Sequence, residues 1–71
     1  MPLKPFFLRG DHITLAQAVK VVGLADSGGQ AKGMVREGLV AVNGVVETRP
    51  GRKLLAGDRF GLGEQEWVLE R

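Results

Sequence analysis

The sequence predicts an α+β fold in which two short helices pack on one side of a small, mostly antiparallel sheet of four to five short strands. Three observations support this class. Apolar residues recur with helical spacing in two neighbouring segments, 14–22 and 27–37, and a capping residue and a glycine bound each segment. An Asn-Gly pair between apolar runs then marks a hairpin. Short apolar runs separated by turn residues fill the rest of the chain.

The first helix is expected to begin at Thr14, because residues 14–17, Thr-Leu-Ala-Gln, fit a capping box. Gly23 is expected to end it in the left-handed conformation that glycine adopts freely. The stripe that faces the core has the spacing i, i+3, i+4, i+7 and consists of Leu15, Ala18, Val19 and Val22.

The second helix follows almost at once and is expected to end at Gly38. Residues 27–30, Ser-Gly-Gly-Gln, fit a second capping box. Lys32 and Arg36 fall on the outward face, opposite a buried stripe of Ala31, Met34 and Val35. Glycines at helical positions cost about 1 kcal/mol each relative to alanine. We therefore interpret the glycines of this segment, 28, 29 and 33, as sites of close backbone approach to the first helix or to a ligand.

The remaining elements are short strands. A strand over residues 5–9, around Phe6-Phe7-Leu8, contains a proline and is expected at a sheet edge. Asn43-Gly44 predicts a type I′ turn between strands at 39–42 and 45–48. After a loop at 49–53, further strands are expected at 54–55, 59–62 and 65–70. The aromatic side chains are expected to pack in the core, and they are Phe6, Phe7, Phe60 and Trp67.

Length and composition indicate one small cytoplasmic domain, residues 1–71, which we expect to be a monomer. A chain of 71 residues buries a thin core, and the absence of cysteine excludes disulfides and thiolate metal sites. No apolar run approaches the roughly 20 residues that span a membrane. The N-terminal stretch lacks the apolar region of a signal peptide.

Catalysis has little support, so we expect no enzymatic activity, no cofactor, no metal and no small-molecule substrate. His12 is the only histidine and has no second ligand for a metal, so it is interpreted as a loop residue. Ser27 has no base placed beside it and is interpreted as a helix cap. The glycine-rich run around it lacks the spacing of a P-loop.

The charge distribution points to an anionic partner for one face. The net charge is only +2, but residues 27–53 carry five cations against Glu37 and Glu47, while the last eight residues are acidic. If the loop at 49–53 folds back beside the second helix, the five cations line one surface: Lys32, Arg36, Arg49, Arg52 and Lys53. Free amides at the start of that helix would also favour a phosphate. Charge alone does not separate such a site from an ordinary solvated face.

Several runs resemble one family of RNA-binding domains. They are SGGQAK at 27–32, EG at 37–38, VAVNG at 40–44 and AGD at 56–58. In this order and spacing they are similar to the domain named after ribosomal small-subunit protein four, also called the αL motif, over a core of residues 13–60. The runs EGLVAVNG and VETR are most similar to its stand-alone bacterial members of the YbcJ type.

The resemblance implies two helices on a small sheet and binding of structured RNA, either ribosomal or transfer RNA. It places the RNA contacts on the second helix and on the loop after the hairpin. Carried over by position, the contacts are Ser27, Gln30, Lys32, Arg36, Arg49, Arg52 and Lys53, and Lys20 on the first helix extends the patch. Many family members have Arg where this chain has Gly28, and Arg-Leu-Asp where it has Thr14-Leu15-Ala16. Two familiar RNA contacts are therefore missing.

Three alternatives use the same sequence features. The first is a protein-interaction adaptor that docks through its acidic C-terminal strand or through the edge at Phe6–Leu8. The second is a ubiquitin-like sulfur carrier, which the C-terminal Leu-Glu-Arg disfavours because such carriers end in Gly-Gly. The third is a DNA-binding antitoxin-like module, which would need base-reading side chains on the second helix and a dimer to reach two half-sites.

Overall fold

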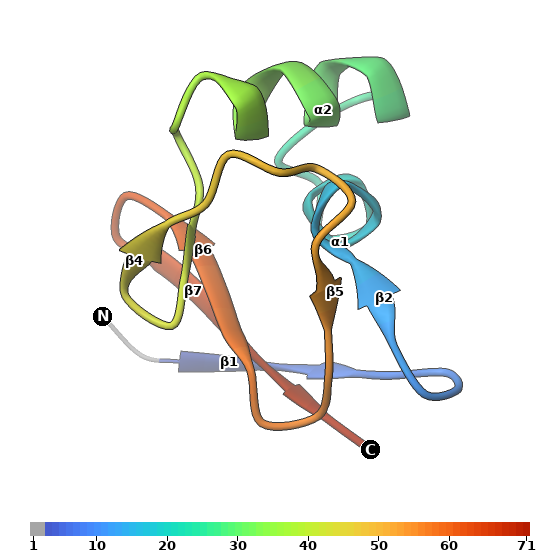
Figure 1. Ribbon diagram of the computed structural model, residues 1–71. Helices are drawn as coiled ribbons and strands as arrows, with labels where there is room; N and C mark the ends of the chain where they lie inside the picture. The colour runs from blue at the N-terminus through green and yellow to red at the C-terminus, as the bar shows by residue number, and fades with distance from the viewer. Residues whose placement is uncertain (1–2) are drawn as a thin grey trace.

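The computed structural model describes residues 3–71 as two helices and seven strands, with both helices on the same side of the sheet (Figure 1). Residues 1 and 2 of the expected domain lie outside the described range. In chain order the elements are β1 Leu3–Phe7, β2 Ile13–Thr14, α1 Leu15–Val21, α2 Gly28–Arg36, β3 Ala41–Val42, β4 Val45–Val46, β5 Lys53–Leu54, β6 Arg59–Leu62 and β7 Gln65–Glu70. The predicted α+β class is confirmed.

The main sheet has five strands in the order β1-β7-β6-β3-β4. All of its neighbours are antiparallel except β1 and β7, which run parallel with Phe6 opposite Leu69. The predicted edge position of the N-terminal strand is confirmed, although the strand covers Leu3–Phe7 and not residues 5–9. The last strand lies between two others, so its backbone is not open to a further strand.

A separate two-stranded ribbon, β2 with β5, was not predicted from the sequence. Ile13 pairs with Leu54, and Thr14 pairs with Lys53. Lys53 was expected in a loop but is the first residue of β5, so its backbone is fixed beside the start of α1.

Both predicted boundaries of α1 are confirmed. The Thr14 hydroxyl accepts a hydrogen bond from the Gln17 amide, and the Gln17 side chain accepts one from the Thr14 amide at 3.1 Å. The helix ends in a Schellman motif, in which Gly23 has φ +87° and the Leu24 amide donates to the Val19 carbonyl at 3.1 Å. The predicted apolar stripe faces the core.

The second predicted capping box is only half formed. Ser27 Oγ accepts from the Gln30 amide at 3.1 Å, as predicted, but Gln30 Oε1 accepts from the amide of Asp26 at 2.6 Å and not from that of Ser27. The side chain therefore reaches one residue further back than in a standard box. At the other end Gly38 has φ +78° and the Leu39 amide donates to Met34 O, again a Schellman motif.

The glycines of α2 do not mark close approach to α1, so that half of the interpretation was wrong, and approach to a ligand stays a prediction. A Cβ atom added at Gly28 or Gly33 would meet nothing within 4 Å, and one at Gly29 would meet only Ser27 Oγ at 3.9 Å. These positions face open space because α2 packs through the stripe around Ala31 and Val35.

The hairpin turn is confirmed as type I′, since Asn43 has φ +52° and Gly44 has φ +83°. Its strands are only two residues each, shorter than expected. The Asn43 side chain also ties this turn to the next strand, because Oδ1 accepts from the Arg59 amide at 2.9 Å and Nδ2 donates to Asp58 at 3.1 Å.

The core lies between the helix pair and the sheet, and aromatic rings form one end of it. Phe60 is fully buried, stacks on Trp67 with 5.5 Å between centroids, and meets the edge of Phe6 at 6.0 Å. Phe7 was expected in the core but is 66% exposed, because alternate residues of a strand point to opposite faces. Neither helix within residues 3–71 has the length and apolar character needed to cross a bilayer.

Candidate nucleic-acid interface

The outward face of α2 presents two cations that form no ion pair with any residue in the range 3–71. Lys32 and Arg36 are both exposed and lie four residues apart, which places their side chains one turn apart on the same face. Ala31 and Val35, each one position earlier, are fully buried and fix this orientation. Both charges are therefore open to an anion in solution.

The other two predicted contacts on α2, Ser27 and Gln30, act first as structural caps. Their side-chain oxygens accept hydrogen bonds from backbone amides, so both side chains are held at the start of the helix. The Ser27 hydroxyl and the Gln30 amide group can still donate a hydrogen bond to a phosphate oxygen. Their role in ligand binding stays a prediction.

The loop after the hairpin is organised by a carboxylate, Glu47, that was counted in the sequence only as a negative charge. Arg49 donates to this carboxylate from Nε and Nη2, each at 3.1 Å, in the bidentate geometry that is common in arginine–carboxylate pairs. Its backbone amide adds a third bond at 3.0 Å. Arg52 donates from Nη1 at 2.9 Å.

These bonds set the charge state of the cluster. The hydrogen bond from the Arg49 side chain, followed by that from Arg52, lowers the pKa of Glu47 from 4.5 to about 2. The same pairing raises the pKa of Arg49. The carboxylate is thus ionised and the two guanidinium groups are charged at neutral pH, which leaves one net positive charge on the three residues.

Both arginines keep donors for a ligand. Arg49 uses two of its three guanidinium nitrogens for Glu47, and its side chain is 75% exposed. Arg52 uses one nitrogen, and its side chain is 34% exposed. Because a guanidinium carries five N–H donors, each group can bind Glu47 and a phosphate oxygen at the same time.

The loop is tied to the helix pair at both of its ends. On one side the Glu47 amide donates to the Val40 carbonyl at 3.0 Å, which joins the loop to the segment that leaves α2. On the other side the carbonyls of Pro50 and Arg52 accept the amides of Ala16 and Leu15, the first residues of α1, at 3.0 and 2.8 Å. Figure 1 shows the loop running from β4 past the helices to β5. The loop thus caps α1 while it presents its arginines.

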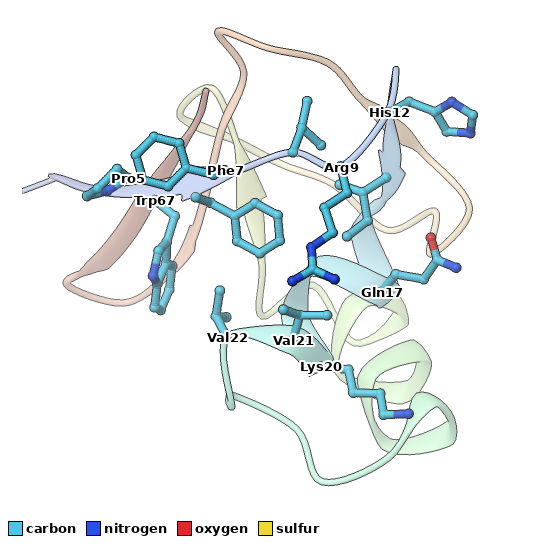
Figure 2. Close-up of a pocket in the computed structure, with 12 residues that line it drawn as sticks. Pro5, Phe7, Arg9, His12, Gln17, Lys20, Val21, Val22 and Trp67 are labelled. Carbon is cyan, nitrogen blue, oxygen red and sulfur yellow. The ribbon is translucent and has the colours of Figure 1, made fainter. Parts of the chain in front are cut away.

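The structure divides the eight predicted contacts into three groups. Four lie on α2 or at its N-cap, namely Ser27, Gln30, Lys32 and Arg36. Three lie on the loop 47–52, called here the Glu47 loop, or on the strand that follows it, namely Arg49, Arg52 and Lys53; Arg49 and Lys53 are exposed and Arg52 is half-buried. Lys20 lies on α1 and lines an open groove between α1 and β1 (Figure 2).

Sequence reasoning missed Glu47 as a positioning residue. A local signal was present, because a carboxylate two residues before one arginine and five before another can reach both across a tight turn. Because Glu47 was expected on a hairpin strand ending at residue 48, it was not considered as a partner for the arginines of the loop.

The comparisons with known proteins agree with this architecture. The family model of the S4 domain matches residues 6–69. The putative RNA-binding protein YbcJ of Escherichia coli K12 is 46% identical over 46 residues, which are 65% of this chain and 66%, just under two thirds, of that protein. The probable ribosome maturation protein RlbA of Bacillus subtilis 168 is 41% identical over 54 residues, 76% of each chain.

A solved structure is also similar over the whole chain. The solution structure of E. coli YbcJ, described as revealing an αL motif involved in RNA binding, superimposes with a TM-score of 0.71 at 32% identity. The similarity covers 100% of this chain and 91% of that one. On the family match, the relatives and the shared fold, this chain belongs to the S4 domain family.

Proposed function

We propose that the protein binds structured RNA, ribosomal or transfer RNA, mainly through the phosphate backbone and without catalysing a reaction. Two observations carry the proposal together. Lys32 and Arg36 on α2 form no ion pair within residues 3–71, and Glu47 holds the arginines of the neighbouring loop in fixed positions. The names of the relatives, an RNA-binding protein and a ribosome maturation protein, support the same class of ligand. We also propose that the protein acts as a monomer in the cytoplasm.

The arrangement suits phosphates better than base edges. The candidate surface offers charged groups and hydroxyl or amide donors, which contact phosphate oxygens without reading sequence. The cations on the face of α2 and those on the loop can contact phosphates in two separate stretches of the RNA backbone, whereas reading a base needs several donors at one point. Recognition would then depend on the shape of a folded RNA, such as a helix or a helix–loop junction.

Fluorescence anisotropy tests the proposal directly. A labelled RNA hairpin from ribosomal RNA is titrated with the protein at low and near-physiological salt, beside duplex DNA of equal length. The expected result is tight, salt-sensitive binding that prefers the RNA. Lys32→Glu combined with Arg36→Glu is expected to abolish it, because both changes reverse charges on the exposed face of α2.

A matched control separates the site from overall charge. Arg59→Glu with Arg71→Glu changes the net charge by the same amount at two cations outside the candidate surface. Binding that survives the control and fails in the α2 variant supports the site. Equal losses in both variants, or no loss in either, would contradict it.

A second candidate, a protein-interaction adaptor, has one observation in its favour. The edge strand β4 and the segment between α2 and β3 expose three apolar side chains, Leu39, Val45 and Val46. The sequence-based version of this idea used the C-terminal strand or the edge at Phe6–Leu8; β7 is paired on both sides, and the open edge of β1 contains Pro5, which has no N–H to donate. An adaptor would therefore dock at β4, and its partner would still bind the Lys32→Glu/Arg36→Glu variant.

A further inference from the structure

An open groove separates α1 from β1 and the turn that follows it. Its volume is about 930 Å³, at the upper end of the range of small-ligand pockets. Figure 2 shows β1 along one side, α1 along the other, and Trp67 at one end. The groove lies apart from the Glu47 loop and from the exposed face of α2, so the proposed phosphate surface does not use it.

The walls of the groove hold apolar side chains that the fold leaves in water. Phe7 of β1 is 66% exposed and Val21 of α1 is 65% exposed, and both line the groove. Both residues line one groove, and ligand grooves are typically lined by apolar and aromatic side chains with a few polar groups.

The rim of the groove is basic. Arg9, Lys20 and His12 line it, and no carboxylate does so within residues 3–71. In Figure 2 the guanidinium of Arg9 extends from the β1 side toward Val21 on α1. The one acidic residue in the adjoining turn, Asp11, is 3.6 Å from Arg71 and does not line the groove. An apolar, partly aromatic wall with a cationic rim is complementary to an anion that carries flat apolar rings.

The edge of β1 disfavours an added peptide strand. The Leu8 amide donates to Glu70 of β7, so by the alternation of strand backbones the groups of Phe7 and Pro5 face the open edge. Proline has no N–H to donate at that edge. A peptide that extended the sheet would lose a ladder bond at the centre of the strand.

We propose that this groove binds one or two unpaired nucleotides of single-stranded RNA that flank the structured part of the ligand. A base would stack on Phe7, and Arg9 and Lys20 would bind the adjoining phosphates. This inference rests on the proposed function, because it gives the same RNA a second contact on the opposite side of α1.

The test compares two RNAs that share one hairpin. The first is blunt, and the second carries five unpaired nucleotides at one end. The expected result is about tenfold tighter binding of the extended RNA, as stacking of a single base provides. Phe7→Ala should remove this increment and, separately, Arg9→Gln should reduce it, and both variants should leave binding of the blunt hairpin unchanged. Trp67 is the only tryptophan and lines the groove, so its emission should change with the extended RNA and not with the blunt one.

The controls distinguish the possible failures. Leu55→Ala truncates an apolar side chain outside the groove that is 54% exposed, against 66% for Phe7, and should keep the increment. Circular dichroism confirms that each variant is folded. An absent increment, or one that survives both groove variants, would overturn the nucleotide site even if the blunt hairpin binds. If the native protein does not bind the blunt hairpin at all, the proposed function itself is overturned. A short acidic, apolar peptide that quenches Trp67 where single-stranded RNA does not would also overturn the proposal.

Discussion

Glu47 accepts three hydrogen bonds from Arg49, one from its backbone amide at 3.0 Å and two from its guanidinium at 3.1 Å each. Glu47 thus fixes both the backbone and the side chain of Arg49. Arg52, which also binds this carboxylate, passes the constraint to α1 through its carbonyl. The geometry of the loop is therefore set by an anion inside the proposed anion-binding surface.

Glu47→Gln tests whether that anion positions the arginines. The change raises the net charge by one, so simple attraction predicts tighter RNA binding. We expect the opposite, a severalfold weaker binding, because the glutamine cannot hold two guanidinium groups at once. Anisotropy titration gives the affinity, and amide hydrogen exchange at Arg49, Arg52 and Leu15 should show faster opening. A gain in affinity would mean that the arginines work without Glu47.

The same carboxylate gives a specific acid dependence. Its pKa is about 2 in the folded chain against 4.5 for an unperturbed group, mainly because Arg49 donates to it. A lowered folded pKa means that the stabilisation is complete above pH 4.5 and is lost as the pH falls toward 2. The difference in unfolding free energy between the native chain and Glu47→Gln should be constant near pH 7 and shrink below pH 4.5. Urea unfolding at several pH values measures it, and a difference that grows in acid would contradict the pairing.

Gly33→Ala should stabilise the protein. The position is inside α2, and an added Cβ meets nothing within 4 Å. Alanine should therefore recover about 0.5–1 kcal/mol of helix propensity, which raises Tm by about 2–8 °C in a domain of this size. Gly38→Ala is the matched control, because φ is +78° there and alanine should cost about 1–2 kcal/mol. Thermal melts that move both variants in the same direction would refute this account of α2.

The sequence was most informative where the structure is decided by neighbours along the chain. The caps at Thr14 and Ser27, the glycine ends of both helices and the Asn43-Gly44 turn depend on residues within about five positions. Each was predicted, and each forms. The shift of the Gln30 bond to Asp26 shows that even here the partner of a side chain can move by one residue.

Contacts between distant parts of the chain were harder to predict. The parallel pairing of β1 with β7 joins the two ends of the chain, and no local pattern shows it. The exposure of Phe7 follows from that pairing, since it decides which face of β1 meets the core. The two-residue ribbon of β2 and β5 is too short to leave a periodic signal.

The candidate site was predicted in part for the same reason. Lys32 and Arg36 follow from helical spacing alone, and both are exposed as expected. The position of Lys20 beside β1 required the tertiary structure. Whether any of these residues contacts RNA remains a prediction.

Gly28→Arg should strengthen RNA binding. Many family members have arginine at this position, and the structure has room for it, because an added Cβ at Gly28 meets nothing within 4 Å. One further exposed ion pair with a phosphate should raise affinity about two- to fivefold at low salt. Gly28→Gln has similar bulk without the charge and should leave the affinity unchanged. Weaker binding of Gly28→Arg would mean that the RNA backbone does not lie beside the start of α2.

The salt dependence of binding counts the phosphate contacts. If about four of the five cations on α2, the Glu47 loop and β5 contact phosphates, the slope of log affinity against log salt should be about −3 to −4. Affinity should then fall about 60- to 250-fold between 50 and 200 mM salt. Lys32→Gln with Arg36→Gln removes two of these contacts, so its slope should be shallower by about 2. Arg59→Gln with Arg71→Gln, outside the surface, should keep the native slope. A nearly flat dependence in the native protein would exclude backbone recognition, and equal slopes in the native protein and the α2 variant would exclude α2 as its site.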